Sequence, residues 1–349
     1  MQPRCAVSSG SASAGVSTSN SSSVSNSNSA SASAGATSAR KQPTARARPV
    51  PPKGLYLDHF GLHETPFEIT PDTSFIYRGS AHQEALSMLR LALRSGEGFV
   101  KITGEVGTGK TLMCRTLLAL LTEQPDQITT AYLPKPKLSP CELLRALARE
   151  LRLRCDRRLH EADLHDILQT GLLALAAQNR TVVLCIDEAQ AMPSDTLEAL
   201  RLLSNLETEK RKLLQIVLFG QPELDLLLAQ ACHRSLASRI GFSARLQPLS
   251  GPEVSCYLRH RLAVAGWRGP DVFTPAARWA LWWASGGRPR NANILAHKGL
   301  LLAFGGGGHQ VGLRHIWLAW RDGRLRVHPS MALGLRRNPP SAHAAGAMT

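Results

Sequence analysis

The segment 104–111, Gly-Glu-Val-Gly-Thr-Gly-Lys-Thr, constrains this chain most, because it matches G-x-x-x-x-G-K-[ST] at every fixed position. The apolar run 98–103 before it predicts a short buried strand, and the stretch 112–121 after it predicts a helix. In such a loop, glycines let backbone N–H groups and the helix N-terminus surround a polyphosphate. The sequence therefore predicts a nucleotide-phosphate site here. The alternative is a chance match in a Gly-rich turn.

The loop positions have distinct expected roles. Lys110 is expected to reach the β- and γ-phosphates, and the Thr111 hydroxyl is expected to ligate Mg²⁺. The residues expected to contact the nucleotide are Gly104, Glu105, Val106, Gly107, Thr108, Gly109, Lys110, Thr111 and Leu112.

An acidic pair, Asp187 and Glu188, narrows the range of reactions that the predicted nucleotide site can catalyse. The apolar run 181–186 predicts a buried parallel strand, and Asp187 and Glu188 follow it directly. At that edge of the sheet, Asp187 can hold the Mg²⁺ shell, and Glu188 can orient and deprotonate a water molecule. The alternative is an acidic turn. The pair favours hydrolysis over transfer to a second substrate, and the sequence lacks the Asn-Lys-x-Asp motif of a GTPase.

Two further positions are candidates for sensing the γ-phosphate. Gln221 follows the predicted strand 213–219, with a plain strand-to-helix turn as the alternative. Arg290 opens a helix in the last third of the chain and is expected to reach back to the phosphates. Arg288 competes with it for that role, and a capping turn is the alternative.

Arg239 is the candidate for stabilising transition-state charge on the nucleotide of a neighbouring subunit. Arg234 and Arg245 compete with it, and a structural or solvated arginine is the alternative. This role predicts a homo-oligomer, because the arginine would act on another copy of the chain.

Strand and helix patterns alternate from residue 55 and predict an α/β fold, a three-layer P-loop NTPase core with a parallel sheet. From residue 248 only helical patterns remain, which predicts a small all-helical lid domain. The expected divisions are a disordered Ser/Ala-rich and basic Pro-rich leader at 1–54, a nucleotide-binding domain at 55–247, the lid at 248–325 and a basic flexible tail at 326–349.

The net charge of +15 is uneven. Residues 55–247 hold 22 basic and 23 acidic side chains, whereas 248–323 hold nine and three. Residues 1–54 hold six basic side chains and 324–349 hold four, with no acids in either. This excess can attract DNA or an anionic membrane surface, with solubility as the alternative.

Other features indicate a cytoplasmic protein. The seven cysteines lack C-x-x-C spacing, which fits reduced thiols, and several lie in apolar periodic stretches typical of a core. The start of the chain lacks the apolar region of a secretory signal, and no run of 18 apolar residues is present.

The order of these parts resembles the AAA+ superfamily. Within it, the segments 56–62, 66–72, 96–100, 104–111, 186–190 and 220–224 resemble the ExeA/GspA-type secretion ATPases, with the short pilus-biogenesis type called MshM as the nearest fit. The resemblance covers about residues 55–325.

The resemblance implies an ATPase that uses ATP and Mg²⁺ to support assembly of a type IV pilus or a type II secretion apparatus. It implies assembly proteins as partners and a peripheral place at the inner membrane. Longer members carry a transmembrane helix and a peptidoglycan-binding domain after the ATPase, and neither is expected here. The chain also resembles transposition helper ATPases of the TniB/MuB type, so a DNA-binding ATPase is the alternative.

Overall fold

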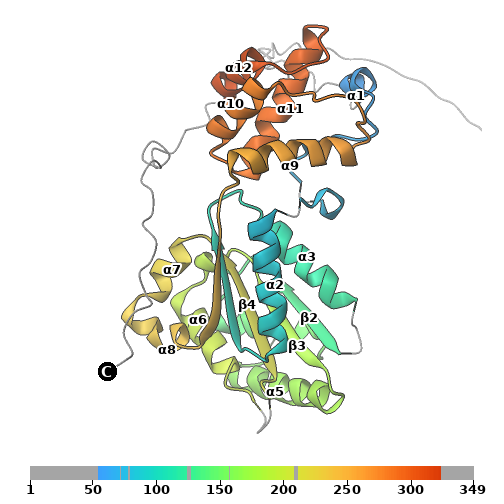
Figure 1. The fold of residues 1–349 in the computed structure, drawn as a ribbon. Coiled ribbons are helices and arrows are strands. Elements are labelled where there is room, and N and C mark those ends of the chain that lie inside the picture. Colours follow the sequence, from blue (N-terminus) through green and yellow to red (C-terminus); the bar gives the residue numbers. More distant parts are fainter. Residues whose placement is uncertain are drawn as a thin grey trace, which may run out of the picture. The chain divides into compact units, whose positions relative to one another are not determined.

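A five-stranded parallel sheet forms the centre of the α/β part in this computed structural model (Figure 1). The structure describes residues 54–323, apart from residues 71, 78, 124–126, 157 and 208–210. The strand order is β2-β3-β4-β1-β5. The strands are β1 (Phe99–Gly104), β2 (Ile128–Leu133), β3 (Thr181–Ile186), β4 (Leu214–Gly220) and β5 (Ile240–Leu246).

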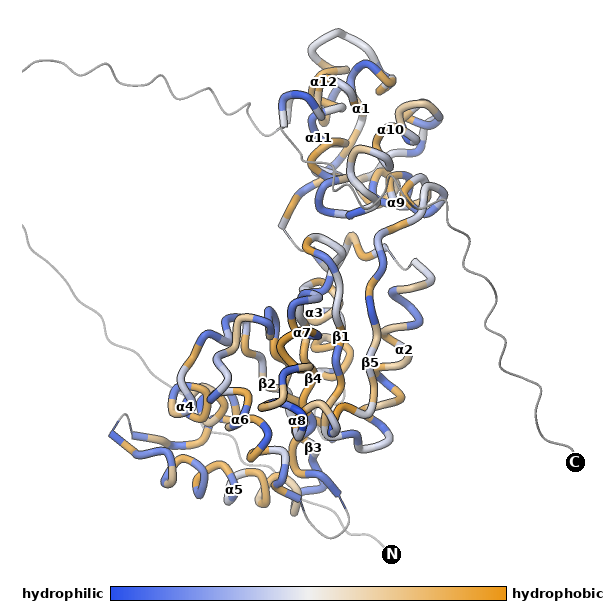
Figure 2. The backbone as a smooth tube through the Cα atoms, turned by 90° about the vertical axis from the view of Figure 1, so that its left-hand side faces the viewer, coloured by the Kyte–Doolittle hydropathy of each residue, from blue (hydrophilic) through white to orange (hydrophobic). Residues whose placement is uncertain are grey.

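Alternation along the strands builds two separate cores. On β3, Val182, Leu184 and Ile186 face one side of the sheet, and Val183 and Cys185 face the other. All five are fully buried, as expected of a parallel strand covered on both faces. Figure 2 shows the hydrophobic colouring along these central strands.

Helices cover both faces and make the three layers that the sequence predicts. The core on one face is built with α2 (Ser80–Arg94) and α3 (Lys110–Thr122). The core on the other face is built mainly with α4 (Pro140–Glu150), α5 (Glu161–Ala177), α6 (Ser194–Leu203), α7 (Glu223–Leu228) and α8 (Arg234–Ala237). The predicted α/β fold is therefore confirmed.

Strand β5 was not among the predicted strands. Its sequence, Ile-Gly-Phe-Ser-Ala-Arg-Leu, alternates half-buried apolar residues with exposed ones, and it pairs only with β1 at the edge of the sheet. An edge strand needs no continuous apolar run, and that run was the signal used for the other strands.

The last third of the described chain is helical, as predicted. It comprises α9 (Gly251–Val264), α10 (Pro275–Ser285), α11 (Pro289–Gly305) and α12 (Leu313–Gly323). The helix α1 (Leu55–Phe60) and the segment after it also contribute to this helical core, through Tyr56, Phe60, Leu62, Phe67 and Phe75. The first described residues thus pack within the helical part before the chain enters the sheet.

A buried polar network joins the segment before α2 to the helical part. Arg261 donates from Nε to the carbonyl of Pro66 and from Nη1 to the Tyr257 hydroxyl at 3.2 Å. Tyr257 donates to Oδ1 of Asn293 at 2.7 Å, and Nδ2 of Asn293 donates to the carbonyl of Glu68 at 3.0 Å. Each polar group therefore has a partner, which a buried polar group needs.

The predicted leader and basic tail lie outside the described residues, except for Gly54. The predicted boundary at 247/248 stays a prediction. Within the described part of the chain, no helix is both long and apolar enough to cross a bilayer.

Candidate functional site

The predicted phosphate loop connects the end of β1 at Gly104 to the start of α3 at Lys110. Gly107 and Gly109 have φ values of 83° and 100°, which side chains other than glycine rarely adopt. A Cβ on Gly107 would also lie 2.9 Å from Cβ of Arg290. The loop conformation therefore requires glycine, and it directs the amino-terminal end of α3 toward the loop, where an anion is favoured.

Lys110 is buried and lies inside this loop. Its Nζ donates to the carbonyls of Gly104 at 2.7 Å and Glu105 at 3.0 Å. Burial lowers the pKa of the Lys110 ammonium, and the carboxylates of Glu188 and Asp187 act in the opposite direction. The ammonium thus lies between the loop backbone and the acidic pair, where a phosphate can replace its carbonyl partners.

Asp187 follows β3 at the same edge of the sheet and is only 4% exposed. Burial raises the pKa of its carboxyl, although hydrogen bonds with the Thr111 side chain and the Glu188 N–H oppose the rise. A buried carboxylate beside a hydroxyl supplies the hard oxygen ligands that Mg²⁺ prefers. Mg²⁺ is usually bound by one or two protein oxygens and takes its other ligands from phosphates and water, so one carboxylate and one hydroxyl fit this ion.

The Glu188 carboxylate is held by two amide side chains. Nε2 of Gln190 and Nε2 of Gln221 donate to the same oxygen, Oε2, at 2.6 and 3.0 Å. The backbone N–H of Gln221 donates to Oε1 of Gln190 at 2.9 Å, which closes a ring of three residues. Burial opposes ionisation of Glu188, but the two amides and the nearby Lys110 outweigh it and lower the pKa of the carboxyl.

The backbone at Glu188 is also unusual. Its φ of 54° lies in the left-handed region, which costs about 1–3 kcal/mol for a residue other than glycine. Such conformations persist where the surroundings hold them, and they gather at functional sites. The two amides provide that support here.

His82, which sequence reasoning missed, holds the phosphate loop from α2. Its Nε2 lies 2.9 Å from the carbonyl of Thr108, so Nε2 carries the proton and donates. The other ring nitrogen, Nδ1, is buried and has no hydrogen-bond partner among the described residues. Burial lowers the pKa of His82, although the bond to Thr108 and the charge of Glu253 act against this.

The amino-terminal end of α11 contacts the loop through Arg288 and Arg290, but the two residues do so differently. The backbone N–H of Arg290 donates to the carbonyl of Gly107 at 3.2 Å, while its side chain is exposed. The guanidinium of Arg288 lies 3.6 Å from the Glu105 carboxylate, and its Nε is buried without a hydrogen-bond partner in the part of the chain that the structure describes. The choice between them as the phosphate sensor stays open.

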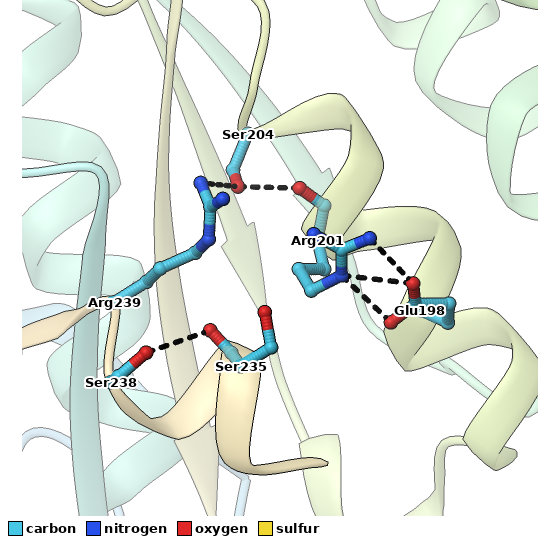
Figure 3. Close-up of polar contacts among 6 residues, drawn as sticks. All are labelled: Glu198, Arg201, Ser204, Ser235, Ser238 and Arg239. Atoms are coloured by element: carbon cyan, nitrogen blue, oxygen red, sulfur yellow. Dashed lines mark hydrogen bonds and ion pairs between the residues drawn. The ribbon is translucent and has the colours of Figure 1, made fainter. Parts of the chain in front are cut away.

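Arg239 lies away from the loop of its own chain. It precedes β5, whose first residue Ile240 pairs with Phe99 at the start of β1, whereas the loop follows Gly104 at the end of β1. Five steps along a strand span about 17 Å. In Figure 3 the Arg239 side chain points toward Ser204, to which Nη1 donates at 3.4 Å.

The two competing arginines, Arg234 and Arg245, lie near opposite ends of strand β5. Arg234 is exposed at the start of α8, while Arg245 is exposed on β5 and pairs with Thr103 next to the loop. Arg239 and Arg234 therefore fit a role on a neighbouring copy better than on their own nucleotide.

The sequence carried only weak signals for Gln190 and His82. Gln190 lies two residues after the acidic pair, and its role depends on the left-handed turn at Glu188, which no motif encodes. His82 lies 26 positions before Thr108, so only the fold brings the two residues together.

Known proteins are similar in sequence to this chain. Residues 93–228 match the family described as AAA domain. General secretion pathway protein A of Aeromonas hydrophila is 45% identical over 258 residues, which are 74% of this chain and 46% of that protein. The chain therefore spans about half the length of this relative.

Solved structures with low sequence identity share the fold. Cdc6p of Pyrobaculum aerophilum aligns with a TM-score of 0.58 at 17% identity, covering 76% of this chain and 74% of that one. The ORC2 protein of Aeropyrum pernix, in ADPNP–ADP complexes, aligns with a TM-score of 0.53 at 19% identity, covering 72% of each chain.

Proposed function

We propose that this chain hydrolyses ATP between Lys110 and Glu188, because residues 93–228 match an AAA domain and the chain is similar to general secretion pathway protein A. The resemblance to ATPases of the ExeA/GspA type is confirmed by that relative. The proposal depends on one observation above all: Glu188 is held by Gln190 and Gln221 at the sheet edge that carries the phosphate loop. A carboxylate fixed in place in this way can orient a water molecule and lies where it can accept a proton from it.

Each residue of the site has a proposed task. Lys110 and the backbone of Gly107 to Thr111 bind the phosphates. Asp187 and Thr111 hold Mg²⁺, which when bound offsets the negative charge that develops on the phosphates. Glu188 orients the attacking water and takes its proton, and Gln221 senses the γ-phosphate while it holds Glu188.

Hydrolysis is proposed to need more than one copy of the chain. Arg239 lies at the amino-terminal end of the strands and the loop at their carboxyl end, so its guanidinium is proposed to stabilise transition-state charge on another copy's nucleotide. A homo-oligomer follows from this assignment. Arg288 or Arg290 would report the state of the nucleotide to α11.

The proposed process is assembly of a type II secretion apparatus. The support is the 45% identity to a protein named for the general secretion pathway. Assembly of a type IV pilus is a finer form of the same proposal, with assembly proteins at the inner membrane as partners. The DNA-binding transposition helper ranks below both, because no observation of the described residues favours it over secretion.

Two experiments separate the activity from the process. Purified full-length protein should hydrolyse ATP with Mg²⁺, and Lys110→Ala should abolish both ATP binding and turnover. A strain that lacks the gene should then be complemented with the wild type or with Glu188→Gln, and secreted protein and surface pili measured in parallel. If the wild-type gene restores ATPase activity to the strain but changes neither secreted protein nor surface pili, the proposed process is rejected. The proposed ATPase activity would still stand.

A further inference from the structure

Tryptophan is confined to the helical part. All six tryptophans of the chain lie between residues 267 and 320. Three of them are unusually open to solvent: Trp279 is 61% exposed, Trp283 45% and Trp317 50%. Large aromatic side chains left exposed close together mark a surface that binds something apolar.

These side chains form one continuous face on α10 and α12. Trp279 and Trp283 are four residues apart on α10, so they lie on the same side of that helix. Trp283 contacts Trp320 of α12 edge to face, with ring centroids 6.0 Å apart. Trp317 lies one turn before Trp320 and follows Leu313, which is 50% exposed, by four residues. We call this set the tryptophan face.

Two arginines of α12 accompany this face. On α12, Arg314 and Arg321 are exposed, and the Arg321 guanidinium lies over the Trp317 ring at 5.4 Å. The three acidic side chains of residues 248–323 already have partners: Glu253 caps α9, Asp271 pairs with Arg278, and Asp322 pairs with Lys298. The chain beyond α12 adds four arginines and no acid.

We propose that the tryptophan face docks on an anionic lipid membrane surface, with Trp279, Trp283 and Trp317 entering the headgroup region. Tryptophan rings favour the boundary between headgroups and hydrocarbon, because they are apolar with one polar N–H. Arginines beside them are attracted to anionic lipids, and two such signals together give stable binding. The nucleotide site lies on other elements, so this proposal can fail while ATP hydrolysis stands.

Charge complementarity selects a membrane over a second copy of the chain. Another tryptophan face would carry the same arginines, and like charges brought together are unfavourable. A protein partner would have to offer acidic groups around an apolar centre. Contact between copies is one of the outcomes of the experiment below.

The experiment measures sedimentation of the full-length protein with vesicles of phosphatidylglycerol and phosphatidylcholine, and with phosphatidylcholine alone. The test variant carries Trp279→Gln, Trp283→Gln and Trp317→Gln. The control is Leu226→Gln, which removes an apolar side chain that is 72% exposed on α7. We expect the test variant to lose about tenfold or more in affinity for the anionic vesicles, and the control to match the wild type.

Charge is tested separately. Arg314→Gln and Arg321→Gln should each weaken binding to anionic vesicles about fivefold. Tryptophan emission of the wild type should shift to shorter wavelength with anionic vesicles, because all six reporters lie in the helical part. Quenching of that emission by brominated lipids tests insertion without any substitution, so misfolding of a variant cannot hide the answer.

Three results would overturn the proposal. One is wild-type protein that fails to bind anionic vesicles. A second is equal binding by the test variant, which would assign membrane attraction to the basic ends of the chain. The third is a loss of oligomers in the test variant without vesicle binding in the wild type, which would make the face a contact between copies.

Discussion

Gln221 and Glu188 lie 33 residues apart in the chain, yet Nε2 of Gln221 donates to Oε2 of Glu188 at 3.0 Å. The two side chains come from the ends of adjacent strands, β4 and β3. The residue proposed to sense the γ-phosphate therefore touches the residue proposed to activate water. A phosphate that attracts the Gln221 amide would also change how Glu188 is held.

Replacing Glu188 by Gln should stop turnover and leave binding intact. The amide cannot accept a proton from water, so we expect a loss of about 10²–10⁴-fold in kcat. ATP should remain bound, because Lys110 and the loop are unchanged. Steady-state hydrolysis and retention of labelled ATP measure the two effects, and wild-type turnover in the variant would remove Glu188 from the reaction.

Replacing Gln190 by Ala should move the pH profile of kcat. The hydrogen bond from Gln190 lowers the pKa of Glu188, so its loss raises that pKa and protonates the base at a higher pH. The acid limb of the profile should therefore shift toward neutral pH. Gln230→Ala, an exposed glutamine elsewhere in the same domain, provides the control. A lower kcat with an unshifted limb would mean that Gln190 acts only through packing.

ATP affinity should fall as the pH drops below 6.5. The pKa of His82 is lowered from its ordinary 6.5 by burial, so the folded state resists the proton that the unfolded chain accepts. The stability linked to His82 is thus present above pH 6.5 and is lost as the pH falls through the folded-state pKa. A second proton would go onto the buried Nδ1 and place a positive charge where burial opposes it and where the described residues offer no hydrogen-bond acceptor.

The comparison of wild type with His82→Gln isolates this effect. Glutamine can donate to Thr108 but does not titrate, and titration of His297 and of ATP itself is common to both proteins. Calorimetric ATP binding across pH 5–8 should show a smaller decline in the variant. Identical declines would assign the pH dependence to other groups.

Tyr257→Phe should destabilise the helical part by about 1–3 kcal/mol, because it leaves the buried Asn293 oxygen without its donor. Denaturant unfolding measures the change. Ser95→Ala removes an exposed hydrogen bond to Leu91 and should change stability by less than about 0.5 kcal/mol. Equal effects of the two substitutions would contradict a buried network.

Mixing two inactive subunits tests the role of Arg239. Arg239→Ala keeps its own nucleotide site, and Lys110→Ala keeps its own arginine, so a mixed oligomer should regain part of the wild-type turnover. Arg234→Ala and Arg245→Ala, treated the same way, identify which arginine acts. If none of these mixtures regains turnover, the three arginines do not act between copies.

Sequence patterns captured the parts of the molecule that depend on local order. The phosphate loop and the acidic pair follow contiguous motifs, and β3 is an unbroken apolar run. Strand β5 lacked such a run, because it lies at an edge. Contacts made by the fold, such as His82 with Thr108 or Phe60 within the helical core, join residues that no local pattern relates.

Residues 55–75 precede the sheet in the sequence but pack into the helical core, and this has a mechanical consequence. The polypeptide passes between the helical and α/β parts twice, once before α2 and once before α9. A single connection would let the helices swivel freely, whereas a pair of connections restrains twisting and favours bending about one axis. Energy released at the phosphate loop would then produce a stroke with a defined direction.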